Sequence, residues 1–376
     1  MSPADSRRIR IVHFVTGGGS GATRVALDIA LAQCRVADFE PHLILRNKGH
    51  PLPQLMEAQV KEAGLPVYWA DNLWPRARTV AQLRVLCEQI QPTVFFAHGY
   101  SEHLWGRRAA LDSGVPVVIH VEHNVERYLP WRVRAARRLA PRTDATVCVS
   151  TGVEANVRRL GIGGRRVVTL HNGVDLGRFH SDAPIAPRRP DVLMPARFAR
   201  RKDQATLIRA ARLLADRGWQ GQLLLAGGGK AAYRARCERL VQSLGLKEHV
   251  QFLGNVNDLP QRLAACRVAA LASLQEGLPL VLAEAMGAGC AVAASAIPGI
   301  TDILRDSPDA NPNGWLFPAG DAEKAAAALW QALSDDAEAQ RRADAGRRDA
   351  NGHFSLEEMA RRYEDLLRSI LQERGL

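Results

Sequence analysis

Short apolar runs alternate with longer segments of helical period along almost the whole chain, and this alternation limits the fold more than any other feature. Each run has the length of a strand and is rich in Val, Ile, Leu and Phe. Strands that alternate with helices form parallel sheets covered by helices, so we predict an α/β protein. The predicted strands are IRIVHFV, EPHLILR, PVYWA, TVFFAH, VPVVIHVEH, ATVCVS, RVVTLHN, DVLMPAR, QLLLAGG, VQFLG, VAALAS, CAVAAS and GWLFPAG.

The chain divides near its middle. Its 376 residues exceed one ordinary domain of roughly 150 residues. The segment DLGRFHSDAPIAPRRP has three prolines and no helical period, so it is typical of a linker. We predict one Rossmann-like domain over residues 1–178 and a second over residues 179–353. Residues 354–376 are predicted to form a closing helix, because their apolar residues fall on one helical face.

Composition excludes several classes of protein. Apolar residues make up 47% and charged residues 24%, as in an ordinary globular protein. No apolar run approaches the ~20 residues that span a bilayer, and the first residues lack the pattern of a signal peptide, so we expect a cytoplasmic protein. The six cysteines are too widely spaced for a zinc or redox pair.

Positive charge is concentrated in the first half of the chain. The net charge is +11, and residues 1–178 hold 24 Lys and Arg against 15 Asp and Glu, which accounts for +9 of it. The positive electrostatic potential of such a half points to an anionic partner: nucleic acid, an anionic membrane or a phosphorylated substrate. Because neither an aromatic RNA-binding strand nor zinc-finger spacing accompanies the charge, we expect no nucleic acid.

The first glycine cluster, TGGGSGATR, lies between a predicted strand and a predicted helix. Glycines there let the backbone approach a ligand, and the free N–H groups of a helix N-terminus favour an anion. The spacing fits the dinucleotide fingerprint poorly, and the second strand ends in HLILR without an acidic residue. A tight turn without a ligand therefore stays an alternative, and a dehydrogenase is disfavoured.

Two cations follow the first strand of the second half. Arg197 and Lys202 stand five residues apart in PARFARRKD, where an open α/β sheet binds its ligands. A guanidinium and an ammonium there could neutralise a diphosphate without a metal. A solvated basic turn explains this segment equally well.

Two carboxylates eight residues apart mark the segment LQEGLPLVLAEAMG. Glu276 is predicted in the loop after a strand, and the N–H groups that follow it begin a helix. Glu284 lies about one turn into that helix among apolar residues. Because a buried unpaired carboxylate costs several kcal/mol, a hydroxyl-rich ligand such as a ribose or a local arginine should pair with it.

The pattern R-F-x3-K of Arg197 and Lys202, followed by E-G-L-P-L-V-L-A-E, resembles the retaining glycosyltransferases of family 4. The resemblance extends to the first glycine loop, VEHN, LHNGVD, LAGGG and FLGNVND. It implies the GT-B fold, in which two Rossmann-like domains face each other across a cleft and the last helix crosses back to the first domain. Many members carry an acidic residue shortly after the first glycines and a glycine after the lysine, whereas this chain has SGAT and Asp203 there.

The resemblance also implies a role for individual residues. Arg197 and Lys202 would grip the donor diphosphate, Glu276 would hold the hydroxyls of the transferred sugar, and Glu284 would bind the ribose. The backbone amides of Leu280 and Val281 would complete the phosphate site. Val256 would contact the base, and Gly18 and Gly19 would approach the donor from the other domain. No metal and no cofactor besides the nucleotide-diphosphate sugar are expected.

Two histidines complete the predicted site. The resemblance places His123, which follows a buried strand, beside the transferred sugar, and we count it among the catalytic residues. His98 ends the strand TVFFAH, where it either lines the acceptor pocket or belongs to the core.

These predictions combine into one function. We expect a retaining hexosyl- or hexosaminyltransferase that moves a sugar from UDP or GDP to a saccharide or lipid-diphosphate-linked acceptor in bacterial lipopolysaccharide or exopolysaccharide synthesis. The basic, aromatic segment of residues 126–144 favours contact with the inner face of the cytoplasmic membrane, although a helix with solvated arginines fits equally well. The alternatives are a UDP-hexosamine epimerase on the same scaffold and a non-catalytic sugar-nucleotide-binding partner.

Overall fold

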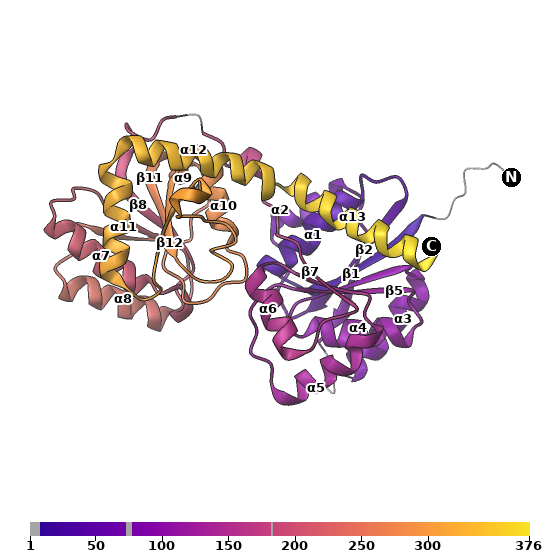
Figure 1. The fold of residues 1–376 in the computed structure, drawn as a ribbon. Helices are drawn as coiled ribbons and strands as arrows, with labels where there is room; N and C mark the ends of the chain where they lie inside the picture. The colour runs from indigo at the N-terminus through magenta and orange to yellow at the C-terminus, as the bar shows by residue number, and fades with distance from the viewer. Residues whose placement is uncertain (1–7, 73–76, 182) are drawn as a thin grey trace. The chain divides into compact units, whose positions relative to one another are not determined.

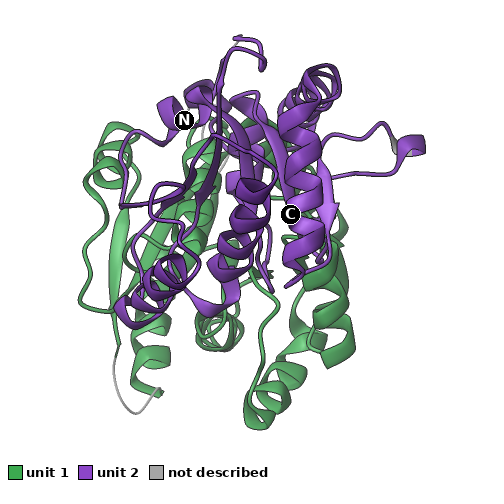
Figure 2. Ribbon diagram, turned by 90° about the vertical axis from the view of Figure 1, so that its left-hand side faces the viewer, with its two compact units in different colours: residues 1–173, 356–376 green, residues 174–355 purple. Residues whose placement is uncertain are grey.

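The computed structural model describes residues 8–72, 77–181 and 183–376, and these divide into two compact units (Figures 1 and 2). Unit 1 comprises residues 1–173 and 356–376, and unit 2 comprises residues 174–355. The chain therefore leaves unit 1 once and returns to it with its last helix. The predicted boundary at 178 lies five residues beyond the end of the first segment of unit 1, and the predicted boundary at 353 lies two residues before the end of unit 2.

Unit 1 contains a seven-stranded parallel sheet with the order β3-β2-β1-β4-β5-β6-β7. The first six positions have the strand order of the Rossmann fold, whose ligands bind at the carboxyl ends of the strands. The strands are β1 (Ile9–Thr16), β2 (Phe39–Asn47), β3 (Val67–Asp71), β4 (Val94–His98), β5 (Val117–Glu122), β6 (Ala145–Cys148) and β7 (Arg166–Thr169).

Helices cover both faces of this sheet, as strands buried on both sides require. One face packs against α1 and α2 through a cluster that includes Val15, Leu27 and Met56, and the other packs against α3 and α4 through Phe14 and Phe95. The helices are α1 (Gly21–Gln33), α2 (Gln54–Glu62), α3 (Ala77–Ile90), α4 (Glu102–Asp112), α5 (Pro130–Leu139), η1 (Ala140–Arg142), α6 (Thr151–Leu160) and α13 (Leu356–Arg374).

Unit 2 repeats the architecture with a six-stranded parallel sheet in the order β10-β9-β8-β11-β12-β13. Strands β8 and β11 are neighbours although more than 70 residues separate them. The strands are β8 (Arg189–Pro195), β9 (Leu223–Ala226), β10 (Val250–Gly254), β11 (Cys266–Leu271), β12 (Ala291–Ser295) and β13 (Trp315–Phe317).

The helices of unit 2 flank its sheet in the same manner (Figure 1). Helix α10 lies against β12 and α12, and α11 lies against α7. They are η2 (Leu176–Arg178), η3 (Arg200–Lys202), α7 (Gln204–Asp216), α8 (Ala231–Ser243), α9 (Leu259–Ala265), α10 (Leu280–Gly287), η4 (Pro308–Ala310), α11 (Ala322–Ser334) and α12 (Asp336–His353).

Helix α13 joins the core of unit 1 through the face that its sequence predicts. Met359, Tyr363, Leu367, Ile370 and Leu371 are buried, and α13 packs against α1. The Tyr363 ring lies 6.3 Å from the Phe96 ring of β4. At roughly 2 kcal/mol for each fully buried large apolar side chain, this stripe holds the helix firmly to the sheet.

The structure confirms the predicted fold class. A strand forms in each of the thirteen predicted segments, and both units are parallel α/β sandwiches with Rossmann strand order. None of the described helices is both long enough and apolar enough to cross a bilayer.

Candidate active site

The centre of the candidate site in unit 2 is an ion pair at the carboxyl edge of the sheet. Lys202 Nζ lies 2.5 Å from Glu276 Oε1, and both side chains are largely buried. The same carboxylate oxygen accepts a hydrogen bond of 2.5 Å from Ser273 Oγ. Because Lys202 follows β8 and Glu276 follows the neighbouring β11, the sheet topology brings the two predicted residues together across 74 positions.

A second contact fixes the two loops that carry this pair. The backbone N–H of Leu274 donates to the carbonyl of Arg201 over 2.7 Å. The Ser295 hydroxyl, from β12, donates to the Ser273 carbonyl over 2.6 Å. Backbone and side-chain hydrogen bonds therefore hold the Lys202–Glu276 geometry together.

Arg197 projects from a loop whose backbone is held by the glycines of LAGGG. The Phe198 N–H donates to the Gly228 carbonyl over 2.6 Å, and the Lys230 N–H donates to the Phe198 carbonyl over 3.0 Å. A Cβ on Gly229 would lie 2.5 Å from the Phe198 carbonyl oxygen, so only glycine allows this approach. The Arg197 side chain is exposed, and no described residue forms an ion pair with it.

Asp203 stands where many family members have glycine, and it adopts a left-handed conformation with φ +47° and ψ +51°. Asp and Asn tolerate this region better than other non-glycine residues. Its carboxylate accepts a hydrogen bond of 2.6 Å from Thr206 Oγ1, and its carbonyl accepts one from the Thr206 N–H. The left-handed turn redirects the chain from the short η3 helix into α7.

Helix α10 begins at the same edge of the sheet. Pro279 precedes its first turn without a capping side chain, so the N–H groups of Leu280 and Val281 have no acceptor within the helix. Glu284 lies on this helix and is partly exposed, yet surrounding protein atoms desolvate it. Burial raises the pKa of the Glu284 carboxyl to about 7, and the positive charge of Arg178 opposes this effect.

Val256 lies just beyond β10, in the loop that follows the strand. It is half-buried, and its neighbour Asn255 is so close to Gly228 that a Cβ there would lie 2.7 Å from the Asn255 amide oxygen. The Gly227 N–H donates to the Gly254 carbonyl over 2.6 Å. The loops after β9 and β10 are therefore packed on one another beside the loop that carries Arg197.

In unit 1 the first glycine loop connects β1 to α1. Gly18 has φ +82°, and a Cβ on Gly19 would lie 2.8 Å from Pro53 Cγ. Ser20 caps α1 by accepting a hydrogen bond of 3.1 Å from the Thr23 N–H. The positive φ requires glycine at position 18, and the contact with Pro53 requires glycine at position 19. Both requirements hold independently of any ligand.

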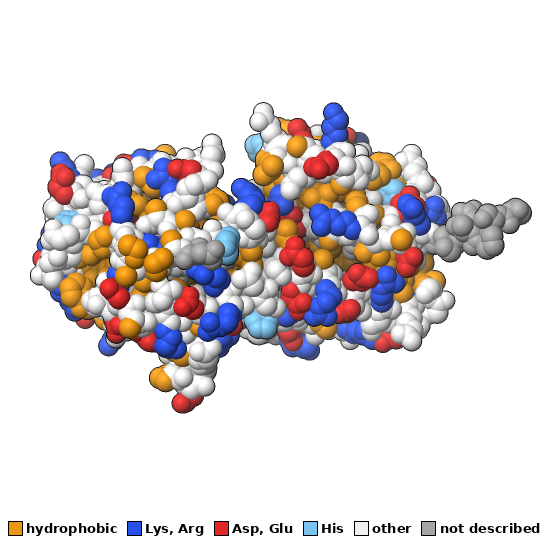
Figure 3. Space-filling view, turned by 90° about the horizontal axis from the view of Figure 1, so that it is seen from above, with side chains coloured by type: hydrophobic (Ala, Val, Ile, Leu, Met, Phe, Trp, Pro, Cys, Tyr) orange, Lys and Arg blue, Asp and Glu red, His pale blue; other side chains and the backbone are white. Residues whose placement is uncertain are grey.

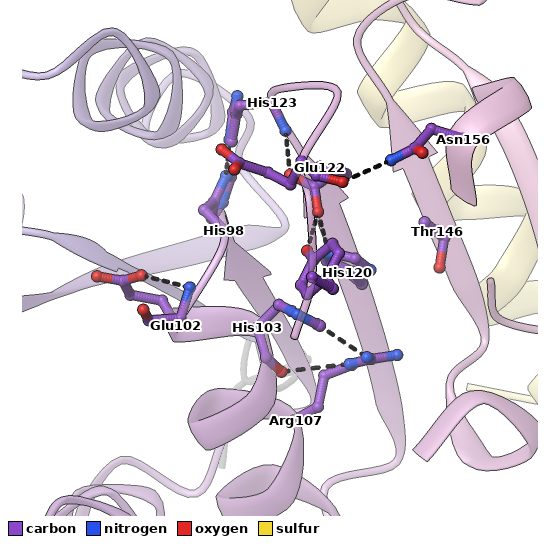
Figure 4. A network of polar contacts seen from close by, with 12 residues as sticks. His98, Glu102, His103, Arg107, His120, Glu122, His123, Thr146 and Asn156 are labelled. Atoms are coloured by element: carbon purple, nitrogen blue, oxygen red, sulfur yellow. Dashed lines mark hydrogen bonds and ion pairs between the residues drawn. The ribbon is translucent and has the colours of Figure 1, made fainter. Parts of the chain in front are cut away.

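His123 stands at the end of a chain of hydrogen bonds on the α1 face of the sheet. Its nearest member, His98, lies beside it in Figure 4. His123 Nε2 lies 3.2 Å from His98 Nδ1, and His98 Nε2 lies 3.1 Å from His13 Nδ1. His13 Nε2 in turn lies 2.8 Å from the side-chain oxygen of Gln33, at the end of α1. Burial lowers the pKa of His13 and of His123 to about 4 and holds that of His98 well below its ordinary value, so all three are neutral at pH 7.

A different cluster fills the opposite face of the sheet. The Tyr128 hydroxyl donates to Glu122, and the His120 ring stacks on the His103 ring at 4.2 Å. Arg107 is fully buried and donates to His103 Nδ1 over 2.8 Å (Figure 4). It also donates to Thr143 Oγ1 over 3.2 Å. Burial raises the pKa of the Glu122 carboxyl and lowers the pKa of Arg107 to about 10. His120 therefore belongs to the core and not to the chain that ends at His123.

The sequence did not point to several of these polar residues. His13 and Gln33 complete the chain below His123, and Arg46 forms a buried ion pair of 2.7 Å with Glu102 at the carboxyl edge of the sheet. His13 has a usable signal, since a histidine inside the apolar run IRIVHFV requires a buried partner. Among the described residues, no group of three or more His, Cys, Asp or Glu side chains could hold a metal ion.

Comparison with family models now identifies the chain. The model of the glycosyl transferases group 1 matches residues 178–349, and the model of Glycosyltransferase Family 4 matches residues 19–178. The chain is a family 4 glycosyltransferase. The two matches meet at residue 178, so between them they span most of both units.

Two curated relatives of this family 4 glycosyltransferase carry names that state a pathway or an acceptor. The lipopolysaccharide core biosynthesis glycosyltransferase LpsE of Rhizobium meliloti is 32% identical over 60% of this chain and 65% of LpsE. The GalNAc-α-(1→4)-GalNAc-α-(1→3)-diNAcBac-PP-undecaprenol α-1,4-N-acetyl-D-galactosaminyltransferase of Campylobacter jejuni is 26% identical over 79% of this chain and 82% of that enzyme.

Solved structures share the fold over nearly the whole chain. Anabaena Alr3699/HepE in complex with UDP and glucose matches with a TM-score of 0.81 and 21% identity, and covers 96% of this chain and 100% of its own. The sucrose-phosphate synthase of Thermosynechococcus elongatus matches with a TM-score of 0.79 and 21% identity, and covers 97% and 100%. At this identity the likeness establishes the fold alone.

Proposed function

We propose that this chain is a retaining glycosyltransferase that transfers a sugar from a nucleotide-diphosphate sugar to a saccharide or lipid-diphosphate-linked acceptor. One observation carries the proposal: Lys202 and Glu276 form a largely buried ion pair at the sheet edge where α10 begins with no capping side chain. Fixed positive charge and helix N–H groups suit a diphosphate, and a buried carboxylate suits sugar hydroxyls. Family membership supports the same donor class.

Each side chain of unit 2 has a proposed task at the donor. Arg197 and Lys202 neutralise the diphosphate, together with the amides of Leu280 and Val281. Glu276 accepts hydrogen bonds from the transferred sugar. Because Arg197 is exposed and has no described ion-pair partner, it is free to close on the phosphates when donor binds.

The remaining contacts surround the nucleoside and the sugar. Glu284 binds the ribose hydroxyls, and this binding is stronger when the carboxyl is ionised. Val256 packs on the base. From unit 1, Gly18 and Gly19 approach the donor with their backbone, and His123 binds a hydroxyl of the sugar.

The chemistry follows from where charge develops. The bond between the anomeric carbon and the phosphate oxygen breaks, the acceptor oxygen bonds to the same face of that carbon, and the acceptor proton passes to a phosphate oxygen of the departing nucleoside diphosphate. Negative charge grows on the diphosphate, so Arg197, Lys202 and the α10 amides stabilise the transition state more than the ground state. Because these cations supply the compensating charge, the proposal requires no metal.

The acceptor is proposed to be a bacterial surface glycan, free or linked to a lipid diphosphate. Named relatives act in lipopolysaccharide core biosynthesis and on PP-undecaprenol-linked glycans. Helix α5 offers a surface suited to an anionic membrane: Leu129 and Trp131 are exposed by 54% and 52%, beside the exposed arginines Arg134, Arg137 and Arg138. We therefore propose a peripheral enzyme at the inner face of the cytoplasmic membrane.

Substitution of Lys202 tests the proposal. Lys202→Ala should lower kcat by more than about 100-fold, since one preorganised charge on the departing group is worth roughly 3 kcal/mol. The variant also leaves the buried Glu276 carboxylate without its partner, so the midpoint of urea unfolding should fall, and kcat is measured where unfolding shows the variant to be folded. Arg200→Ala, two residues earlier on the same turn, is the control and should retain activity. An unchanged rate in Lys202→Ala would remove the assignment.

The donor and the reaction type are tested separately. A thermal-shift panel of UDP, GDP, ADP and their sugars identifies the nucleotide, because a ligand at 100 times its Kd stabilises the folded state by about 2.7 kcal/mol. Nucleotide release should then require an acceptor. Release without acceptor, with an epimerised sugar as product, would instead establish an epimerase.

A further inference from the structure

The three hydrogen-bonded histidines, His13, His98 and His123, lie on or directly after three neighbouring strands, β1, β4 and β5. In the strand register, His13 of β1 pairs with Phe96 of β4, and His98 of β4 pairs with Val121 of β5. His98 therefore lies two residues beyond Phe96, the partner of His13, and His123 lies two residues beyond Val121, the partner of His98. Since side chains two apart point to the same face, all three rings lie on the face covered by α1.

The series of hydrogen bonds begins at Gln33, which lies 90 positions before His123 in the sequence. Gln33 is the last residue of α1 and is 5% exposed, and His13 and His98 are fully buried. The His13 ring stacks on Phe96 with its centroid at 4.6 Å and an interplanar angle of 7°. Packed rings of this kind cannot turn to find other partners, so the hydrogen bonds have one possible path.

The first acceptor fixes the direction of every bond in the chain. Gln33 faces His13 with its carbonyl Oε1, which only accepts, so His13 Nε2 carries a proton and donates it. His13 is neutral, so its Nδ1 is bare and accepts from His98 Nε2–H. By the same step His98 Nδ1 is bare and accepts from His123 Nε2–H. The proton of His123 is thereby placed on Nε2.

The other ring nitrogen of His123, Nδ1, has no hydrogen-bond partner among the residues that the structure describes. This atom is also closed off from water. A buried acceptor without a donor costs about 1–3 kcal/mol, which a donor group from a ligand would recover. The histidine is otherwise held on both sides, since its backbone N–H donates to Glu122 Oε1 over 3.0 Å.

We infer that Gln33, His13 and His98 are positioning residues that hold His123 in the Nε2–H tautomer, with its Nδ1 lone pair kept for a hydroxyl group of the bound sugar. This inference rests on the proposed place of His123 beside the transferred sugar. His123 then accepts a hydrogen bond and does not act as an acid. His98, whose two ring nitrogens are both engaged, supports His123 in place of contacting the acceptor.

Nitrogen NMR of histidine-labelled protein tests the tautomer directly, without substrate. At pH 7.5, with His123 assigned by the signals missing in His123→Asn, we expect a bare Nδ1 and a protonated Nε2. A proton on Nδ1 of His123 would overturn the inference, because a Gln33 amide turned the other way would reverse every donor in the chain.

Gln33→Met tests whether the chain transmits this constraint. Methionine keeps the size of the side chain and removes the acceptor, so His123 should become a mixture of tautomers, and kcat/KM should fall about tenfold, the equivalent of one neutral hydrogen bond. Ile29→Val, one turn earlier on α1 and equally buried, perturbs packing alone and should change neither readout. Wild-type His123 signals in Gln33→Met would overturn the inference.

The two proposals can fail separately. Suppose that the wild-type protein shows the expected tautomer and Gln33→Met shifts it, but no nucleotide sugar is turned over with any acceptor. The glycosyltransferase proposal then fails, and the positioning role of Gln33, His13 and His98 is retained. If transfer occurs and the tautomer is the reverse, only the positioning role is lost.

Discussion

Asp203 illustrates how a single residue meets the demands of this site without the usual glycine. Its φ of +47° is required by the turn between η3 and α7, immediately after Lys202. An L-residue pays about 1 kcal/mol for this conformation, and the hydrogen bond from Thr206 offsets part of it. The side chain therefore supports the turn that positions a proposed catalytic cation.

Substitutions at Asp203 should follow backbone preference. Asp203→Gly and Asp203→Asn should stay within about 1 kcal/mol of the wild-type free energy of unfolding, because both accept the left-handed region. Asp203→Ala should lose about 1–2 kcal/mol, since it keeps the strain and loses the Thr206 contact. Urea unfolding measures the order; an alanine variant as stable as the glycine variant would contradict the argument.

Glu284 should make stability depend on pH. Its pKa in the folded protein, about 7, lies above the ordinary value of 4.5, so the folded state holds the proton more tightly than the unfolded state. The resulting stability is fully present below pH 4.5 and is lost as the pH rises to 7 and beyond, by up to about 3 kcal/mol.

The comparison variant for this effect is Glu284→Gln, which cannot ionise. Without ligand, the wild type and the variant should have similar urea midpoints at pH 4.5, and the variant should be the more stable at pH 8. Equal stability at pH 8 would mean that the carboxyl ionises in the folded protein without cost. Nucleotide binding should be weaker in the variant at pH 8, since an amide oxygen is a poorer acceptor for ribose hydroxyls.

At the scale of elements, the glycine run after β9 determines where the neighbouring loop can lie. Gly229 has φ +137°, and its missing Cβ leaves room for the Phe198 carbonyl oxygen. Gly218, at the end of α7, also has positive φ, but no atom lies within 4 Å of an added Cβ. A side chain at Gly218 would therefore meet conformational strain alone, whereas a side chain at Gly229 would meet both strain and a steric clash.

Alanine at these two glycines should therefore have unequal effects. Gly218→Ala should cost about 1 kcal/mol of stability and leave kcat/KM unchanged. Gly229→Ala should cost more and should also lower kcat/KM, because the Arg197 loop must move. Activity and urea unfolding measured on both variants decide the point; equal effects on kcat/KM would show that the glycine run does not position Arg197.

Much of this arrangement could be predicted from the sequence. The strand segments fix a parallel sheet, and a sheet with Rossmann order places the loops after β8 and β11 side by side, so Lys202 and Glu276 could be paired from their place after two strands. The histidine chain could not, because it depends on register: a shift of one residue would turn His98 to the other face of the sheet. The orientation of Gln33 depends on side-chain packing, which no sequence pattern encodes.

At the scale of the whole molecule, charges of both signs are interspersed on the face seen in Figure 3, so the excess of positive charge forms no single field there. The proposed membrane contact rests instead on one helix, α5, where aromatic, aliphatic and basic side chains coincide. Arg132 also stacks over the Tyr100 ring at 4.3 Å, which anchors the helix to its own unit. Attraction to anionic lipid should consequently be local and sensitive to salt.

Vesicle sedimentation tests this surface. The wild type should bind vesicles containing phosphatidylglycerol more tightly than vesicles of phosphatidylcholine, and the double variant Leu129→Ser/Trp131→Ser should lose most of this binding. The control Leu55→Ser/Val85→Ser removes similarly exposed apolar groups from α2 and α3 and should bind normally. Equal loss in both double variants would mean that apolar exposure in general, and not α5, attracts the lipid.

The division of unit 1 between two stretches of chain has a consequence for its biogenesis. A ribosome must translate all 182 residues of unit 2 before it reaches α13, so the sheet of unit 1 waits with the apolar surface opposite Tyr363 and Leu367 uncovered. Unit 2 is uninterrupted and has no such delay. The half of the protein that begins first is thus completed last, and its open flank during translation is where a chaperone would be needed.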